Sequence, residues 1–189
     1  MNPTKACAKA LNKGLIAVIP TDTVYGVVCR ADNVKAVKRL YGLKSREHKP
    51  GTVIAASIDQ LVDLGIKRRY LTVVSQYWPG AVSIEIPHDL GYLSQNTGRQ
   101  AFRVTKDSGL KKILESTGPL LTSSANKPGQ PVATNLAQAR QYFDGRVDFY
   151  LDGGEVQSEP STLIRVVDDI VEVLREGAVK INEKGEVKN

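Results

Sequence analysis

The sequence predicts a single α/β domain with a twisted, mixed parallel and antiparallel sheet, flanked by helices around a concave basic cleft. Short apolar runs alternate with helical patterns along the 189 residues. Several connections are too short for a helical crossover, so some neighbouring strands must be antiparallel. A chain of this length buries one substantial core. We expect the domain to span residues 1–182 and the Lys-rich residues 183–189 to fray.

The predicted helices carry apolar residues three or four positions apart and begin beside a residue that caps them. In chain order they cover residues 3–12 after Asn2, 34–41 after Asp32, 58–64 near Ser57 or Asp59, 69–78, 108–114 after Asp107 or Ser108, and 134–142. Pro3 in the first turn and Gly14 after the end define the first helix, and Pro79-Gly80 ends the fourth.

The predicted strands are short apolar or alternating runs between turn residues. In chain order they cover residues 15–19, 52–56, 81–86, 101–104, 119–122, 147–151, 161–166 and 170–174. Pro20 ends the first strand, because proline cannot donate to a sheet ladder. We predict loops over residues 20–27 and 87–100.

The composition is that of a globular protein with an anionic partner. Apolar residues make up 41% of the chain and charged residues 24%, and the formal net charge is +6. Cys7 and Cys29 form no CxxC pair, so we expect neither a zinc site nor a disulfide, and reduced thiols favour the cytoplasm. The apolar run over residues 15–19 is too short to cross a bilayer, so no membrane partner is expected.

The loop after the first strand reads Pro20-Thr21-Asp22-Thr23-Val24-Tyr25-Gly26-Val27. Its hydroxyls, carboxylate and phenol suit a small polar ligand at the mouth of an α/β sheet. They equally suit a turn in which Asp22 and Thr23 bond their own backbone. The residues alone leave both interpretations open.

A basic segment and a distant polar segment form the centre of the predicted site. Lys44, Arg46 and Lys49 lie within six residues at the end of a predicted helix, and Ser124 and Asn126 follow a predicted strand. An Arg fork and Lys point charges complement a polyphosphate, while short hydroxyl and amide side chains orient it. The alternative is a solvated helix end beside an ordinary polar loop, because basic helix ends are common.

Common nucleotide-binding and nucleophile motifs do not occur in the sequence. It contains neither GxxxxGK[ST] nor GxGxxG, so we expect side chains to hold a bound nucleotide. His48 lies inside the basic segment, where contact with a substrate carboxylate is left open, and His88 is predicted as a surface loop residue. Neither belongs to a Ser-His-Asp or Cys-His set. We therefore expect the substrates to supply the nucleophile, and the protein to supply position and charge stabilisation.

With these residues in view, the chain resembles the YrdC family, the threonylcarbamoyl-AMP synthases of tRNA modification. The resemblance covers nearly the whole length and rests on seven segments in the family's order. They are Pro20–Gly26 as P-T-[DE]-T-x-Y-G, Lys44–Arg46 as K-x-R, Trp78–Val82 as W-P-G-P-[VL], Arg103 in V-R-[VI], Ser124–Asn126 as S-x-N, Ser161–Ile164 as S-T-[IV]-[IV], and Leu174–Gly177 as L-R-x-G. Longer members carry a second domain, and this chain is similar to the short, single-domain form.

The resemblance implies an enzyme that forms threonylcarbamoyl-AMP and pyrophosphate from L-threonine, bicarbonate and ATP, for N6-threonylcarbamoyladenosine in tRNA. It also implies Mg²⁺ bound with ATP, with no metal site of the protein's own. A downstream threonylcarbamoyl transferase complex is the implied recipient of the product.

The family's functional positions match two sets of residues. The ATP set is Lys44, Arg46, Lys49, Ser124, Asn126 and Arg175, and the implied catalytic residues within it are Lys44, Arg46, Ser124 and Asn126. The threonine set is Thr23, Arg103, Thr122 and Ser161. Within it, Arg103 is the natural partner of the substrate carboxylate. The chain departs from the family pattern at Glu47, where Pro is usual, and at Arg99 and Val132, where hydroxyl residues are usual.

An RNA-binding module of the same fold is the alternative function. A net charge of +6 suits tRNA or double-stranded RNA. Only 6% of the chain is aromatic, however, and the basic residues have no aromatic residues interleaved among them. Pyrophosphate release that requires threonine and bicarbonate would identify the enzyme, whereas salt-dependent RNA binding without turnover would identify the module.

Overall fold

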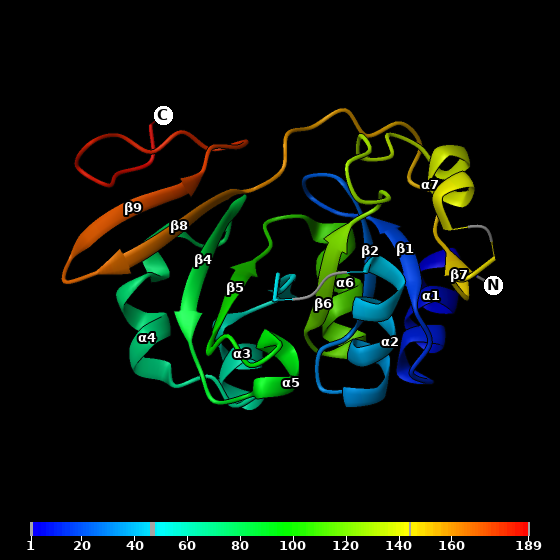
Figure 1. Cartoon of the computed structure of the whole chain (residues 1–189), viewed down its shortest axis with the longest axis horizontal. Coiled ribbons are helices and arrows are strands. Elements are labelled where there is room, and N and C mark those ends of the chain that lie inside the picture. The colour runs from blue at the N-terminus through cyan, green and yellow to red at the C-terminus, as the bar shows by residue number, and fades with distance from the viewer. Residues whose placement is uncertain (1, 46–47, 144, 189) are drawn as a thin grey trace.

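The apolar runs of the sequence come together in one sheet. The computed structural model describes residues 2–45, 48–143 and 145–188. Its strands are β1 (Ala17–Pro20), β2 (Tyr25–Arg30), β3 (Thr52–Ala55), β4 (Val82–Pro87), β5 (Arg99–Val104), β6 (Leu120–Ser124), β7 (Phe149–Tyr150), β8 (Thr162–Val167) and β9 (Ile170–Arg175). Across the described residues they form a nine-stranded sheet in the order β7-β1-β2-β6-β3-β5-β4-β8-β9 (Figure 1).

The pairing directions confirm the predicted mixed sheet. The pairs β1–β7, β3–β5 and β4–β8 are parallel. The pairs β1–β2, β2–β6, β3–β6, β4–β5 and β8–β9 are antiparallel. The helices that connect and cover these strands are α1 (Pro3–Asn12), α2 (Val34–Lys44), α3 (Ile58–Asp63), α4 (Arg68–Val73), the 3-10 turn η1 (Ser75–Tyr77), α5 (Gly91–Ser94), α6 (Ser108–Thr117) and α7 (Leu136–Phe143).

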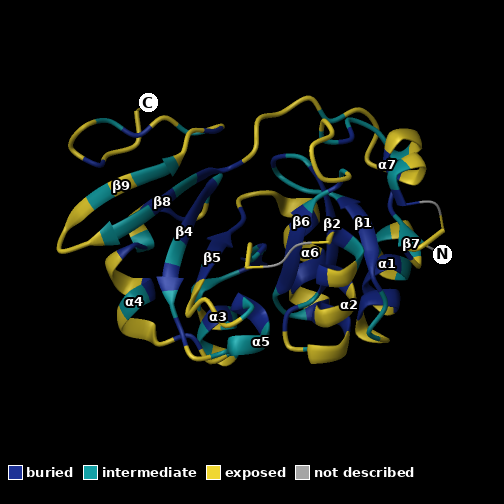
Figure 2. Ribbon diagram, viewed as in Figure 1, coloured by how far each residue is buried: buried dark blue, intermediate teal, exposed yellow. Residues whose placement is uncertain are grey.

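Two hydrophobic clusters pack on opposite faces of the sheet. Val27 of β2 belongs to the larger cluster, with Leu40 of α2. Its neighbour Val28 points to the other face and belongs to the smaller cluster, with Leu11 of α1 and Leu114 of α6. In Figure 2 the inner strands are buried, while the outer surfaces of α2, α4 and α7 are exposed. Burial of these apolar side chains is the main term that stabilises the sheet.

The face that carries the smaller cluster becomes polar along β6. Leu120, Thr122 and Ser124 are alternate residues of β6 and so point to one face. Only Leu120 belongs to the smaller cluster. Arg103 of β5 is paired with Ile54 of β3, a member of that cluster, and so lies on the same face. The sheet therefore presents polar groups beside an apolar region packed by α1 and α6.

Residues 20–27 were predicted as one loop, and this prediction is wrong at its end. Tyr25–Arg30 forms β2, which pairs with β1 from Pro20 opposite Tyr25. Gly26 weakens the strand pattern in the sequence, but an added Cβ there would come 2.5 Å from Thr122 Oγ1 on β6. The glycine is required by close packing inside the sheet.

Other predictions also needed correction. The predicted helix over residues 69–78 is two short elements, α4 and η1, and the predicted loop over residues 87–100 contains α5 and the start of β5. The cap of α2 is Asn33, whose side chain accepts from Ala36 N, whereas Asp32 pairs with Arg30 at 2.5 Å.

His88 is buried, at 8% exposure, and does not lie on the surface as predicted. Its Nδ1 accepts from Leu90 N at 3.0 Å, and its ring packs edge-on against Phe102. Burial lowers the pKa of His88. A polar residue beside Pro87 gave no signal of this packing.

The last residues fold back on the domain. Tyr77 Oη donates to Gly185 O at 2.6 Å, and Ile181 forms an isolated bridge with Val187. Ile181 is also part of the larger cluster. The domain bounds of 1–182 and the fraying of residues 183–189 stay predictions.

Candidate active site

A small cavity gathers all four residues of the predicted threonine set. Its volume is about 160 Å³, and Thr23, Arg103, Thr122 and Ser161 all line it. The cavity therefore has the size of a small metabolite and is below the roughly 300–1,000 Å³ of sites for larger ligands.

An open groove of about 1080 Å³ adjoins this cavity. It is lined by Lys44 and Lys49 from the basic segment and by Ser124 and Asn126 from the polar segment. Ser124 lines the cavity as well, so the two hollows meet at this residue. Arg46, the remaining cation of the basic segment, lies outside the described residues. The cleft's overall basic character stays a prediction.

Arg103 and Asp22 form a buried ion pair at the cavity. Arg103 Nη2 donates to Asp22 Oδ1 at 2.8 Å, and the two side chains are 3% and 10% exposed. Burial lowers the pKa of Arg103, Asp22 opposes this, and the nearby positive charge of Arg175 lowers that pKa further. Arg103 Nε has no hydrogen-bond partner among the described residues. A buried donor of this kind is satisfied by ordered water or by a ligand oxygen.

The loop before β2 combines the two interpretations that the sequence left open. Thr21 Oγ1 donates to Val24 O at 2.7 Å and accepts from the backbone N–H groups of Thr23 and Val24. The side-chain hydrogen bonds to the backbone of this turn are therefore made by Thr21, and not by Asp22 or Thr23. Asp22 is left to pair with Arg103, whose Nη1 lies 3.5 Å from Thr23 Oγ1.

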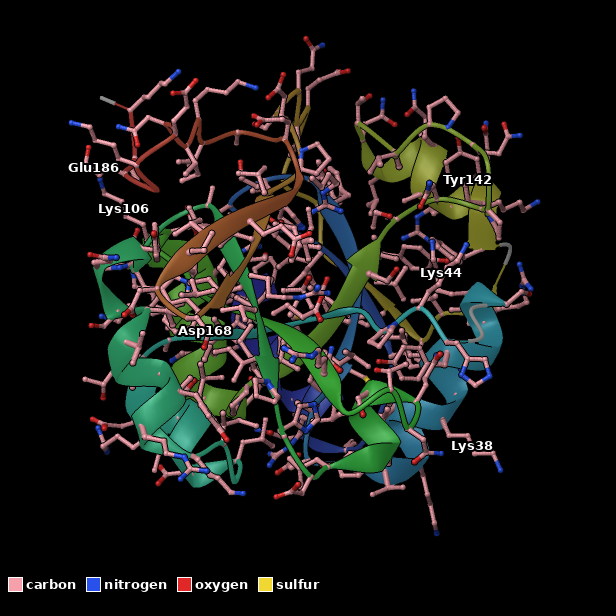
Figure 3. All side chains as sticks on the ribbon, turned by 60° about the vertical axis from the view of Figure 1, so that its left-hand side comes forward. Lys38, Lys44, Lys106, Tyr142, Asp168 and Glu186 are labelled. Atoms are coloured by element: carbon pink, nitrogen blue, oxygen red, sulfur yellow. The ribbon has the colours of Figure 1, made fainter. Side chains whose placement is uncertain are left out.

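Lys44 is buried at 4% exposure at the end of α2. Its Nζ donates to Ser124 O at 2.7 Å, to Asn126 Oδ1 at 2.9 Å and to Asn126 O. The ammonium also lies 5.9 Å from the centre of the Phe143 ring, at the end of α7. Figure 3 shows Lys44 inside the molecule, whereas Lys38 extends outward from the same helix.

Arg175 lines the cavity and is absent from the lining of the groove, although the sequence placed it with the ATP set. Its Nη2 donates to Ser161 O at 2.7 Å. Ser161 Oγ is 2.7 Å from Ser83 Oγ, which is fully buried on β4. Sequence analysis missed Ser83, because a serine in an alternating strand gives no signal of a partner 78 positions away.

Three side chains that the sequence did not single out hold the end of the basic segment. Tyr41 Oη accepts from Gly51 N at 3.3 Å and donates to Leu93 O. Gln95 Oε1 accepts from Lys49 N at 3.1 Å, and Gln100 Nε2 donates to Gly51 O at 2.5 Å. The backbone of Lys49 and Gly51 is thereby fixed against α5 and β5.

His48, for which contact with a substrate carboxylate was left open, lines neither hollow. Both cysteines are buried as free thiols, and burial raises the pKa of Cys7 to about 12 and raises that of Cys29. In the described part of the chain, no three His, Cys, Asp or Glu side chains are grouped to hold a metal ion. No helix there is long and apolar enough to cross a membrane.

Chemically, the arrangement offers a guanidinium for a small carboxylate in one hollow and ammonium groups for a larger anion in the next. Fold and site together define an α/β domain in which a cavity lined by Arg103 adjoins a groove lined by Lys44 and Lys49. The family model for Sua5_yciO_yrdC, described as "Telomere recombination", matches residues 9–177. The chain belongs to the Sua5/YciO/YrdC family.

Curated relatives agree with this family. The chain is 32% identical over 181 residues to threonylcarbamoyl-AMP synthase of Bacillus subtilis (strain 168), covering 91% of this chain and 52% of that protein. It is 33% identical over 153 residues to threonylcarbamoyl-AMP synthase of Stutzerimonas stutzeri (strain A1501), covering 77% of this chain and 82% of that protein. The chain thus spans about half the length of the first relative and most of the second.

Solved structures show the same fold. P. abyssi Sua5 complexed with L-threonine matches with a TM-score of 0.82 at 27% identity, over 93% of this chain and 54% of that one. E. coli YciO matches with a TM-score of 0.78 at 20% identity, over 92% of this chain and 88% of that one. These matches confirm the predicted α/β fold.

Proposed function

We propose that the domain is a threonylcarbamoyl-AMP synthase, which forms threonylcarbamoyl-AMP and pyrophosphate from L-threonine, bicarbonate and ATP. The observation that carries this proposal is the shared wall at Ser124. The cavity with Thr23, Arg103, Thr122 and Ser161 lies directly beside the groove with Lys44 and Lys49. Relatives that carry the synthase name, and a similar structure complexed with L-threonine, support the same activity.

Threonine occupies the cavity in this proposal. Its carboxylate meets the buried guanidinium of Arg103, whose Nε lacks a protein partner among the described residues. Charge-assisted bonds of this kind are short and strong. The cavity lining also includes the hydroxyl residues Thr23, Thr122 and Ser161, which can bond the other polar atoms of the bound threonine. A site that bonds polar substrate atoms discriminates well against analogues that lack them.

ATP occupies the groove, with its triphosphate near Lys49, Ser124 and Asn126. Arg46 completes the cationic set by sequence, and Lys44 adds its charge from the groove wall. Among the described residues that line the groove there is no carboxylate, so this donor set does not fit a metal cage of the protein's own. Mg²⁺ enters with the substrate as MgATP. We assign Arg175 to the boundary of the cavity, where it adds positive charge beside Arg103.

The reaction needs no nucleophile from the protein. The threonine amine and bicarbonate combine to a carbamate and water. A carbamate oxygen then attacks the α-phosphorus of ATP, the bond to the β-phosphate oxygen breaks, and pyrophosphate leaves. The protein holds the reactants next to each other and stabilises the charge on the leaving group with fixed cations.

The proposed setting follows from the reaction. The product is a labile adenylate, so we propose that a threonylcarbamoyl transferase complex uses it to modify tRNA, in the cytoplasm. Affinity for tRNA or double-stranded RNA would be secondary to this transfer.

The test is pyrophosphate release by the purified chain, with threonine, bicarbonate and ATP omitted in turn. The proposal predicts release only when all three are present, together with a threonylcarbamoyl-AMP product identified by mass. RNA binding that falls steeply with salt, is insensitive to ATP and has no turnover would instead identify the binding module.

A further inference from the structure

Three oxygen atoms of the turn at residues 124–126 converge on the ammonium group of Lys44. They are the carbonyl oxygens of Ser124 and Asn126 and the side-chain oxygen of Asn126. An ammonium group has three N–H donors and no acceptor. These three acceptors match the three donors, and a phosphate oxygen would have to displace one of them.

We propose that Lys44 is a positioning residue that sets the conformation of this turn, and thereby places Ser124 between the two substrate hollows. The inference rests on the proposed function for the meaning of the hollows. It differs from the role that the family resemblance implies for Lys44, which is direct contact with the ATP phosphates.

The contacts of the turn separate the part that depends on Lys44 from the part that does not. Ala125 N donates to Tyr25 O at 2.7 Å, and Ala125 O accepts from Ala133 N at 3.0 Å. The centre of the turn is therefore tied to β2 and to the following loop. The flanking residues differ, because Ser124 O and Asn126 O both point at the Lys44 ammonium.

The same cation orients the side chains of the turn. Ser124 Oγ donates to Asn126 Oδ1 at 2.8 Å, and that oxygen also accepts from Lys44 Nζ at 2.9 Å. Asn126 Nδ2 donates to Gln130 O at 2.7 Å. Without the ammonium, three partially negative oxygens would face one another in a buried site. We infer that the turn would open, and that Ser124 Oγ would lose its place in the wall shared by cavity and groove.

The experiment compares Lys44→Met with Lys49→Met in the full chain. Lys49 lines the same groove, but its side chain is exposed, and its backbone N–H keeps its bond to Gln95 Oε1 in the variant. Hydrogen exchange is measured without ligands at the amide of Asn126, which donates to Ser124 O at 2.9 Å, and at the amide of Ala125 as internal reference. Threonine binding is measured by calorimetry without ATP, and the KM for ATP by pyrophosphate release.

Lys44→Met is expected to speed exchange at Asn126 by about tenfold or more, with little change at Ala125, and to weaken threonine binding by about tenfold. Lys49→Met is expected to raise the KM for ATP and to leave exchange and threonine binding unchanged. A Lys44→Met protein with wild-type exchange and wild-type threonine affinity, but a raised KM for ATP, would overturn the proposal and leave Lys44 as a phosphate ligand.

Lys44→Arg keeps the inference testable if Lys44→Met does not fold. A planar guanidinium preserves the positive charge but cannot aim three donors at the same convergent oxygens. The proposal predicts faster exchange at Asn126 in this variant, whereas wild-type exchange would contradict it. Exchange requires no turnover, so it still tests the role of Lys44 if the wild-type protein releases no pyrophosphate.

Discussion

The cavity and the groove share Ser124, but they hold their charges in different ways. In the cavity, Arg103 is 3% exposed and is paired with Asp22 at 2.8 Å. Of the lysines that line the groove, Lys44 is buried under the turn at residues 124–126, whereas Lys38 and Lys49 are exposed. A buried, paired guanidinium gives a fixed direction for one small carboxylate, whereas exposed ammonium groups attract a large anion with little demand on its geometry. Under the proposed function, discrimination would reside in the cavity and charge attraction in the groove.

The largest expected effect follows from breaking the buried Arg103–Asp22 ion pair of the cavity. Asp22→Ala leaves Arg103 buried without its carboxylate, and we expect a loss of about 3–5 kcal/mol in the free energy of unfolding. The matched control is Asp89→Ala, because the Lys67–Asp89 pair is 53% and 85% exposed at 3.1 Å. We expect the control to lose less than about 1 kcal/mol. Urea unfolding of both ligand-free variants measures the difference, and equal losses would show that burial does not distinguish the two pairs.

The next two variants distinguish the binding of ATP from the binding of threonine. Arg46→Ala is expected to lower adenylate synthesis by roughly 30–150-fold, about 2–3 kcal/mol, because it removes a charged phosphate partner. This prediction rests on the K-x-R segment of the sequence, since Arg46 lies outside the described residues. Arg103→Ala is expected to raise the KM for threonine more than the KM for ATP. Steady-state kinetics with each substrate varied in turn measures both, and equal shifts of the two KM values in Arg103→Ala would contradict the carboxylate assignment.

A pair of glycines tests how closely the two hollows are packed. Gly51 lines the cavity, and an added Cβ there would collide with the carbonyl oxygen of Thr122. Gly42 lines the groove on α2, and nothing lies within 4 Å of its added Cβ. We expect Gly51→Ala to cost about 1–3 kcal/mol of stability through overpacking. Gly42→Ala should gain up to about 1 kcal/mol, because alanine favours helix. Thermal unfolding measures both changes. Wild-type stability in Gly51→Ala would show that the cavity wall shifts to accept the added methyl group.

The smallest effect comes from salt. Screening shortens the reach of exposed charges, with a Debye length of about 10 Å at 0.1 M and about 3 Å at 1 M. We expect the KM for ATP to rise roughly three- to fivefold between about 0.05 and 0.5 M KCl, and the KM for threonine to change less than about twofold. A larger response of threonine than of ATP would reverse the contrast between the hollows.

Sequence reasoning was most successful where the signal is local. The strand and helix periodicities gave the mixed α/β sheet, and the caps Asn2, Ser57 and Asp107 are found in the structure. It was least successful at β2, because Gly26 and the polar residues before it suggested a longer loop. The reason for that glycine is a contact with Thr122, which lies far away in the sequence.

In the candidate site, too, residues close in the sequence were easier to predict than residues from separate strands. The cations of the basic segment stand out because they lie within six residues of the sequence, and Lys44 and Lys49 were identified from that clustering. The residues of the cavity come from separate strands, and their grouping was expected only through the family resemblance. Ser83, Gln95 and Gln100 gave no signal, because each acts through a partner 46 or more positions away. Hydrogen bonds between distant segments cannot be read from periodicity or composition.

The most direct measurement is a crystal structure of the chain with L-threonine and a non-hydrolysable ATP analogue. Our account predicts the threonine carboxylate on Arg103 inside the cavity, and the phosphates in the groove against Lys49 and Ser124. Nucleotide density in the cavity, or threonine bound away from Arg103, would contradict it.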